Sequence, residues 1–226
     1  MAEVIEANSH TIQPAKVRKA LIKWGKQNFR VFPWRVTRNP YKLLMSEVML
    51  HRTQAVQVVP VYEKFVDLYP DLHSLGNASR QSLHEVLYSL GLRWRIDLVY
   101  EMGQELNGRF KGQIPKEREE LISLPGISEY IAGAVRCFAW NYPEPILDTN
   151  TVRVVGRLFG LTIKDSSRRN RQFRNLIAAL LDPDEPRAYN YALLDLADKV
   201  CTKKQLPDCP QCPLWAWCQF GKSSTQ

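Results

Sequence analysis

The chain has 226 residues, of which 45% are hydrophobic and 24% are charged, and this composition is ordinary for a globular protein of one or two domains. Its formal net charge of +8 favours a polyanionic partner, nucleic acid above all, although many basic proteins bind nothing charged. No stretch approaches the ~20 apolar residues of a membrane span. The first residues lack the basic start and apolar run of a secretion signal. We therefore expect a cytoplasmic protein without a membrane partner.

Apolar residues recur at helical spacing along nearly the whole chain, beginning with Val17, Leu21 and Trp24 on one face of a first helix. No stretch alternates with period two over the length of a strand, so we predict an all-α fold and no sheet. The expected helices cover residues 17–24, 41–49, 58–65, 81–90, 95–106, 116–123, 129–140, 149–159, 171–181 and 188–200.

The second predicted helix contains a carboxylate among apolar residues, Glu47 in the stretch SEVML. A carboxyl group in such surroundings can act as a general acid, and the alternative is an ordinary charge that faces solvent. Arg52 follows the apolar stripe, where a long side chain could probe a stack of bases. Taken alone, Arg52 is equally well an ordinary surface arginine.

The stretch LPGISEYIAGAV predicts a sharp turn at Leu124–Gly126 between two helices. Gly126 permits a positive φ or a close backbone approach. The helix that follows then presents free backbone N–H groups and the positive end of its dipole, which suit a phosphate. Such a helix–hairpin–helix grips a DNA backbone without reading its sequence. The alternative is an ordinary corner between helices.

Asp148 precedes another helix in the stretch ILDTNTVRVVGRLFG. Its position predicts an N-cap, whose side chain accepts hydrogen bonds from the first turn. The alternative is a carboxylate that stabilises positive charge on a sugar or activates a water molecule.

Four of the five cysteines crowd near the C-terminus with the spacing C-x7-C-x2-C-x5-C, which is typical of a metal site. Four thiolates can hold zinc or a [4Fe–4S] cluster, and a single C-x-x-C with two outlying cysteines favours the cluster. The ligands would be Cys201, Cys209, Cys212 and Cys218. The fifth, Cys137, lies among core-like residues and is interpreted as a small buried hydrophobe.

A basic run, SSRRNRQFR, covers residues 166–174. Such a run is more often a solvated face than a track for DNA, and we read it as solvated.

The chain carries, in this order, VFPWRVTRNPY, SEVMLHRTQ, LPGISEYIAGAV, ILDTNTVRVVGRL and the four-cysteine loop. This ordered set resembles the helix–hairpin–helix DNA glycosylases of the endonuclease III superfamily. The resemblance implies a six-helix barrel over residues 31–142 and a second lobe formed by residues 1–30 and 143–226. It also implies a [4Fe–4S] cluster on the four cysteines, a monomer, and mismatched double-stranded DNA as the partner.

The same resemblance implies roles for individual residues. Asp148 stands at the position of the catalytic carboxylate. Tyr130 stands where bifunctional members carry a lysine that forms a Schiff base, so we expect a monofunctional enzyme that uses water. Gly126 and Ser128 would offer backbone N–H groups to a phosphate, although Ser128 replaces a glycine usual in the family. The remaining expected roles are a leaving-base acid for Glu47, a base-pocket wall for Trp34 and Tyr130, and a contact with the orphan guanine for Arg52.

Two branches of the family compete for the substrate. FPWRVTRNPY and Arg52 resemble the thymine-DNA mismatch glycosylases (Mig), while SEVML and Gln54 resemble the adenine glycosylases (MutY). The adenine branch usually continues into a further domain, and this sequence ends after the cysteine loop. We therefore expect removal of thymine or uracil opposite guanine in base excision repair. The alternatives are adenine opposite guanine or oxidised guanine and, further off, a cluster-bearing protein that binds DNA without catalysis.

Overall fold

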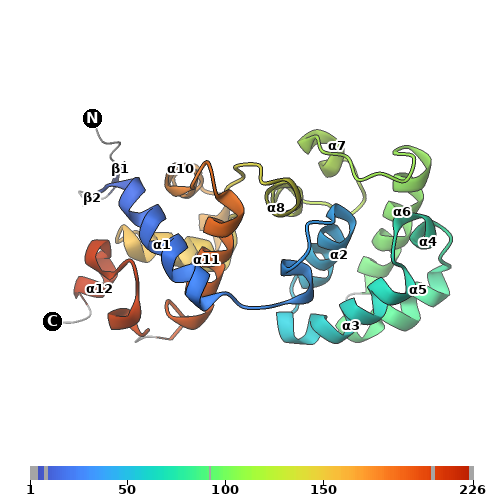
Figure 1. Cartoon of the computed structure of the whole chain (residues 1–226), viewed down its shortest axis with the longest axis horizontal. Helices are drawn as coiled ribbons and strands as arrows, with labels where there is room; N and C mark the ends of the chain where they lie inside the picture. The colour runs from blue at the N-terminus through green and yellow to red at the C-terminus, as the bar shows by residue number, and fades with distance from the viewer. Residues whose placement is uncertain (1–4, 8–9, 92, 205–206, 224–226) are drawn as a thin grey trace. The chain divides into compact units, whose positions relative to one another are not determined.

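The computed structural model describes residues 5–7, 10–91, 93–204 and 207–223 (Figure 1). The chain divides into two compact units. The middle unit is Val31–Trp140, and the terminal unit joins Met1–Arg30 to Asn141–Gln226. No helix in the described part of the chain is both long and apolar enough to cross a bilayer.

The middle unit is built from helices around one apolar core. Helix α2 packs on α8 and α3, while α4 and α5 pack on α6. The side chains of Leu44, Phe65 and Leu106 are wholly buried in this core. Its helices are α2 (Pro40–Leu50), α3 (Ala55–Leu68), α4 (Leu72–Gly76), α5 (Arg80–Leu87), α6 (Arg93–Gly108), α7 (Arg118–Ile122) and α8 (Glu129–Trp140).

The terminal unit has its own core, in which α1 packs along α11 and α9 packs on both α10 and α11. Gly25 allows the first of these contacts, because a β-carbon there would lie 2.4 Å from the Cβ atom of Ala192. Arg30 joins the end of α1 to buried Asp195 through an Nε–Oδ1 ion pair of 2.6 Å. The helices are α1 (Pro14–Asn28), α9 (Thr149–Leu158), α10 (Arg171–Leu180), α11 (Pro186–Lys199) and α12 (Gln219–Ser223).

The prediction of an all-α fold is confirmed, with one correction. Strands β1 (Ile5–Ala7) and β2 (His10–Ile12) form a short antiparallel hairpin, so the prediction of no sheet was wrong. Each strand has only three residues, which is too short for a period of two to stand out in sequence. Helices α4 and α12 were also missed, because each has only five residues and so shows little helical periodicity.

Candidate DNA-binding and catalytic site

The hairpin between α7 and α8 requires glycine at position 126 for two independent reasons. The backbone there has a φ of +77°, in the left-handed region that side chains disfavour. A β-carbon on Gly126 would also lie 2.8 Å from the Cδ1 atom of Leu98. Ile127 is buried beside the turn, while Gly126 and Ser128 stay exposed. The turn is therefore fixed by α6 and presents its backbone to the outside.

Ser128 has a structural role at the start of α8. Its hydroxyl accepts a hydrogen bond from the backbone N–H of Ile131 at 3.3 Å, as an N-cap does. A serine in place of the glycine usual in the family thus stabilises the helix that follows the turn. The N-terminal end of α8 carries the positive end of the helix dipole, so the hairpin offers both partial charge and N–H donors to an anion.

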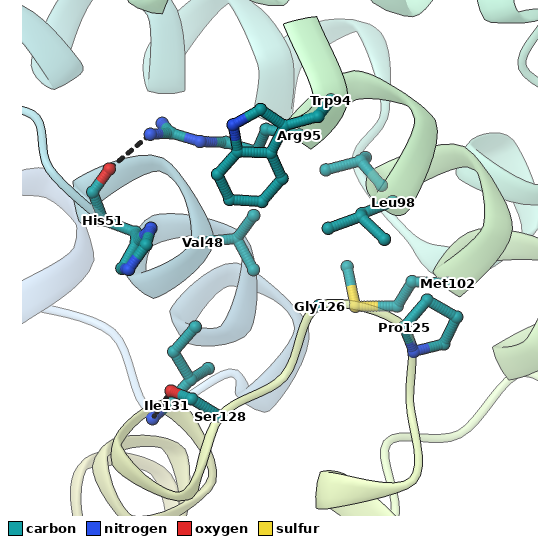
Figure 2. Close-up of a pocket in the computed structure, with 11 residues that line it drawn as sticks. Val48, His51, Trp94, Arg95, Leu98, Met102, Pro125, Gly126, Ser128 and Ile131 are labelled. Carbon is teal, nitrogen blue, oxygen red and sulfur yellow. Dashed lines mark hydrogen bonds between the residues drawn. The ribbon is translucent and has the colours of Figure 1, made fainter. Parts of the chain in front are cut away.

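An apolar pocket of about 140 Å³ lies beside this hairpin (Figure 2). Figure 2 shows Trp94 from α6 and His51 from the end of α2 near its rim, with ring centroids 6.1 Å apart. The indole of Trp94 is 47% exposed, which leaves an aromatic face open to a binding partner. The pocket is lined by Val48, His51, Trp94, Arg95, Leu98, Val99, Met102, Pro125, Gly126, Ser128 and Ile131.

Arg95 ties the pocket to the end of α2. Its guanidinium is buried and donates to the carbonyl oxygen of Met49 at 2.8 Å and to that of His51. These carbonyls belong to the last turn of α2 and have no partners within the helix. Partial burial, then the charges of Arg95 and Arg52, lower the pKa of His51, which favours its neutral imidazole. No local pattern in the sequence marks Trp94 or Arg95 as part of a site.

Two predicted residues lie on the packed pair of helices α2 and α8. Glu47 is only 6% exposed, so the reading of a solvent-facing charge was wrong. Tyr130 is half-buried in the first turn of α8 and packs against the core of the middle unit. Both side chains thus belong to one unit, on helices in direct contact.

Trp34 and Arg52 have contrasting environments in the same unit. Trp34 is 3% exposed in the core, with its ring 5.0 Å from that of Phe32 and 5.3 Å from that of Tyr62. Its role as a pocket wall stays a prediction. Arg52 is exposed in the turn between α2 and α3, and its φ of 61° lies in the left-handed region. A non-glycine residue there costs about 1–2 kcal/mol, so the turn holds Arg52 outward at a conformational cost.

Asp148 is the N-cap of α9, as its position in the sequence predicted. Its Oδ1 atom accepts hydrogen bonds from the backbone N–H groups of Asn150 at 2.8 Å and Thr151 at 2.7 Å. The amide of Asn150 donates to the other oxygen, Oδ2, at 2.8 Å. The hydroxyl of Thr151 completes a capping box. The carboxylate is therefore fixed in place but remains partly exposed.

A chain of hydrogen bonds connects Asp148 to the cysteine loop. The Oδ1 atom of Asn150 accepts from Nη1 of Arg153 at 3.2 Å, and Nε of Arg153 donates to the carbonyl oxygen of Cys201 at 2.9 Å. A second nitrogen of Arg153 donates to the carbonyl oxygen of Ala197 at 2.9 Å. Arg153 is only 8% exposed, so these contacts are shielded from water. Neither Asn150 nor Arg153 was singled out from sequence.

The four clustered cysteines line one small cavity in the terminal unit, whose walls also include Val200, Trp215 and Phe220. Within the described residues, no three His, Cys, Asp or Glu side chains are grouped closely enough to hold a single metal ion. Cys137 lies in the middle unit and is wholly buried, as predicted.

The surroundings of these thiols suit a positively charged group. Burial raises the pKa of the Cys212 thiol to about 12, and it also raises the pKa of Cys209 and Cys218. Such thiols become thiolates only beside a cation. The backbone N–H of Gly221 points at Sγ of Cys218 at 3.4 Å, and Arg157 reaches Sγ of Cys201 at 3.5 Å. Hydrogen bonds to sulfur of this kind stabilise metal-bound thiolates.

Comparison with known proteins adds an independent line of observation. The family described as the HhH-GPD superfamily of base excision DNA repair proteins matches residues 45–179. A thymine/uracil-DNA glycosylase of Pyrobaculum aerophilum is 38% identical over 206 residues, which are 88% of each chain. An adenine DNA glycosylase of Buchnera aphidicola is 32% identical, over 84% of this chain and 54% of the relative. The solved structure of a thermostable thymine-DNA glycosylase matches with a TM-score of 0.86 and 26% identity, covering 93% of this chain and 97% of that one.

Proposed function

We propose that this chain, which belongs to the HhH-GPD superfamily of base excision DNA repair proteins, is a monofunctional glycosylase that removes thymine or uracil opposite guanine. The observation that carries the proposal is the likeness to a thymine/uracil-DNA glycosylase across 88% of both chains. The tyrosine at position 130 supports it, because a phenol cannot form the Schiff base that strand cleavage through a lysine requires.

Binding starts at the hairpin of the middle unit. The exposed backbone around Gly126 and the N-terminal end of α8 bind a phosphate of the DNA, which positions the protein without reading sequence. The target nucleotide is then flipped out of the stack, because its glycosidic bond is unreachable inside the duplex. A mismatched base costs less to extrude than a paired one, and this difference contributes to selectivity.

Residues of the middle unit then recognise the extruded base and the gap it leaves. Tyr130 supplies an aromatic face for the base, and the exposed face of Trp94 offers a further stacking surface beside the pocket. Arg52, held outward by its left-handed backbone, donates to acceptors of the orphan guanine. Glu47 donates a proton to the leaving base.

Asp148 carries the chemical step. As the bond between C1′ and the base nitrogen breaks, positive charge develops on the sugar, and the carboxylate of Asp148 stabilises that charge. A water molecule adds its oxygen to C1′, and its proton leaves toward solvent while the base takes one from Glu47. The three hydrogen bonds that fix the carboxylate keep it in position, so little reorganisation is needed when the charge appears.

The cysteine cavity is the proposed site of a [4Fe–4S] cluster, held by Cys201, Cys209, Cys212 and Cys218. The four thiols line one cavity, and their spacing, a single C-x-x-C with two outlying cysteines, favours a multi-iron cluster over zinc. Such a cluster would cross-link the loop through four thiolates. Arg153 would then transmit the fixed position of the loop to Asn150 and Asp148.

Adenine removal is the second candidate, and SEVML, Gln54 and the likeness to an adenine DNA glycosylase favour it. The thymine/uracil-DNA glycosylase is the more similar of the two relatives, at 38% identity against 32%. A DNA-binding protein without catalysis is the third candidate. Against it stand Asp148, where an uncharged cap would repel DNA less, and Glu47, a buried carboxyl group that costs stability.

The first prediction concerns Asp148. Asp148→Asn should lower the rate of base release by about 10²–10³-fold or more, because the amide carries no charge to oppose the one on the sugar. The variant should stay folded, since its amide oxygen still accepts from the first turn of α9. Single-turnover base release and thermal melting measure the two effects. Asp148→Ala is the comparison, and it should also cost about 1 kcal/mol of stability through loss of the cap. Near-normal turnover in Asp148→Asn would reject the assignment.

The second prediction concerns strand cleavage. The wild type should leave an abasic site with the backbone intact, and borohydride should trap little covalent complex. Tyr130→Lys should introduce trapping, because it places an amine on the first turn of α8. Tyr130→Phe is the matched control and should trap no more than the wild type. Efficient trapping by the wild type would contradict a monofunctional enzyme.

The third prediction concerns the cysteines. Protein purified without oxygen should contain iron and sulfide in equal amounts, about four of each per chain, with the absorption of a cluster in the visible range. Cys212→Ser should lose most of that iron, while Cys137→Ser, in the other unit, should keep it. Colourless protein with stoichiometric zinc would refute the cluster.

The fourth prediction tests the substrate. Single-turnover excision from duplexes with T·G, U·G, A·G and A·oxidised-G pairs should be fastest for T·G and U·G. All duplexes are compared at one salt concentration, because phosphate contacts make every affinity depend on salt. Faster release of adenine from either purine pair would establish the adenine alternative. Binding without release of any base would favour the non-catalytic one.

A further inference from the structure

Half of the formal net charge of the chain lies in one short segment of the terminal unit. Residues 164–174 contain five cations and one carboxylate, Asp165, and therefore carry +4 of the total of +8. We call the five cations the basic patch. They are Lys164, Arg168, Arg169, Arg171 and Arg174, and all five are exposed.

The fold holds this patch in a defined shape. The segment forms a 3₁₀ turn at Asp165–Arg169 and then enters α10. Ser167 is buried and its hydroxyl accepts from the backbone N–H of Lys164 at 2.9 Å, while Asn170 caps α10 by accepting from Gln172 at 2.7 Å. Phe173 is buried beneath the same turn. The arginines are therefore presented from an anchored surface.

Four of the five charges of the patch have no carboxylate partner in the described part of the chain. No ion pair there joins Lys164, Arg168, Arg169 or Arg171 to a carboxylate. The first turn of α10 contains no acidic residue, although the positive end of a helix dipole favours acids there. Like charges thus crowd where the helix itself adds positive potential. Such an arrangement costs stability unless an anion binds.

Several arginines outside the patch form hydrogen bonds within the protein, and in this they differ from the patch. Arg153 and Arg157 donate to backbone carbonyls of the cysteine loop, and Arg95 does so at the end of α2. Arg168, Arg169 and Arg171 are instead exposed at the surface. Guanidinium groups pair with phosphate oxygens through two parallel hydrogen bonds.

We propose that the basic patch is a second contact for the DNA backbone, separate from the hairpin of the middle unit. The proposal rests on the proposed function only in that the partner is DNA. Asp148 begins α9, and the patch follows in sequence after the other end of that helix, in the same unit. The patch would bind phosphates of the duplex rather than the reacting nucleotide. Contacts of this kind hold the protein on DNA of any sequence.

The test is the salt dependence of binding to a fully paired duplex, measured by fluorescence anisotropy. The variant combines Arg168→Gln, Arg169→Gln and Arg171→Gln. The plot of log K against log salt has a negative slope, and each lost phosphate contact reduces the magnitude of that slope by about 0.9. The magnitude should therefore decrease by about 2–3 in this variant. The control combines Lys16→Gln, Lys19→Gln and Lys23→Gln, which removes the same charge from exposed positions of α1. Its slope should stay near that of the wild type.

Equal slopes for the two triple variants would overturn the proposal, because net charge alone would then explain the binding. The same conclusion would follow if the arginine variant kept its DNA slope but lost binding to polyglutamate, since the patch would then serve an acidic protein. Thermal melting of both variants checks that they fold. The duplex contains no mismatch, so the result does not depend on base release. If the wild type binds DNA with a steep salt dependence but releases no base, the proposed function is wrong, while the proposal for the basic patch still stands.

Discussion

The hydrogen bonds of the Asp148 carboxylate are the interaction that positions the start of α9 in the terminal unit. The carboxylate satisfies two orphan N–H groups at the start of α9, and through Asn150 and Arg153 it is linked to the carbonyl of Cys201. A cap alone would tolerate serine or threonine, and a charge alone would tolerate glutamate. Only a short carboxylate meets both demands at this position. On the proposed mechanism, the group that begins the helix is also the group that opposes charge on the sugar, so its position is fixed by the fold before DNA arrives.

In the middle unit, the hairpin exposes backbone donors while neighbouring side chains hold that backbone in place. Leu98 fills the space that a β-carbon on Gly126 would need, so α6 holds the turn from behind. Ser128 takes over one N–H group of α8 and leaves the others at the exposed corner. Arg95 performs the matching task at the far end of α2, where it binds carbonyls that the helix leaves unpaired. The surface proposed to meet DNA is thus built from helix ends, where Ser128 satisfies one N–H group and buried Arg95 binds two carbonyls.

What could be predicted from sequence follows the range of the interactions. The longer helices, the cap at Asp148 and the turn at Gly126 depend on residues within a few positions of one another, and the sequence showed them. The bonds of Arg153 and Arg95 reach carbonyls 48 and 46 residues away, and no local pattern announces such partners. Glu47 lay in an apolar stripe, but only packing of α2 on α8 decided that it is buried. The aromatic face of Trp94 was missed because exposure of a tryptophan leaves no mark on periodicity.

In the proposed mechanism, the two units divide the work between the chemical step and recognition of the base. On that mechanism, Asp148 acts on the sugar, and the sugar is the same whichever base it carries. The terminal unit therefore supplies chemistry that cannot tell thymine from adenine. Discrimination must come from groups that meet the base or its former partner, and the residues proposed for these contacts, Glu47, Arg52 and Tyr130, all belong to the middle unit. On this mechanism, exchanges in the middle unit would change the base that is released, while Asp148 and its hydrogen bonds stayed as they are.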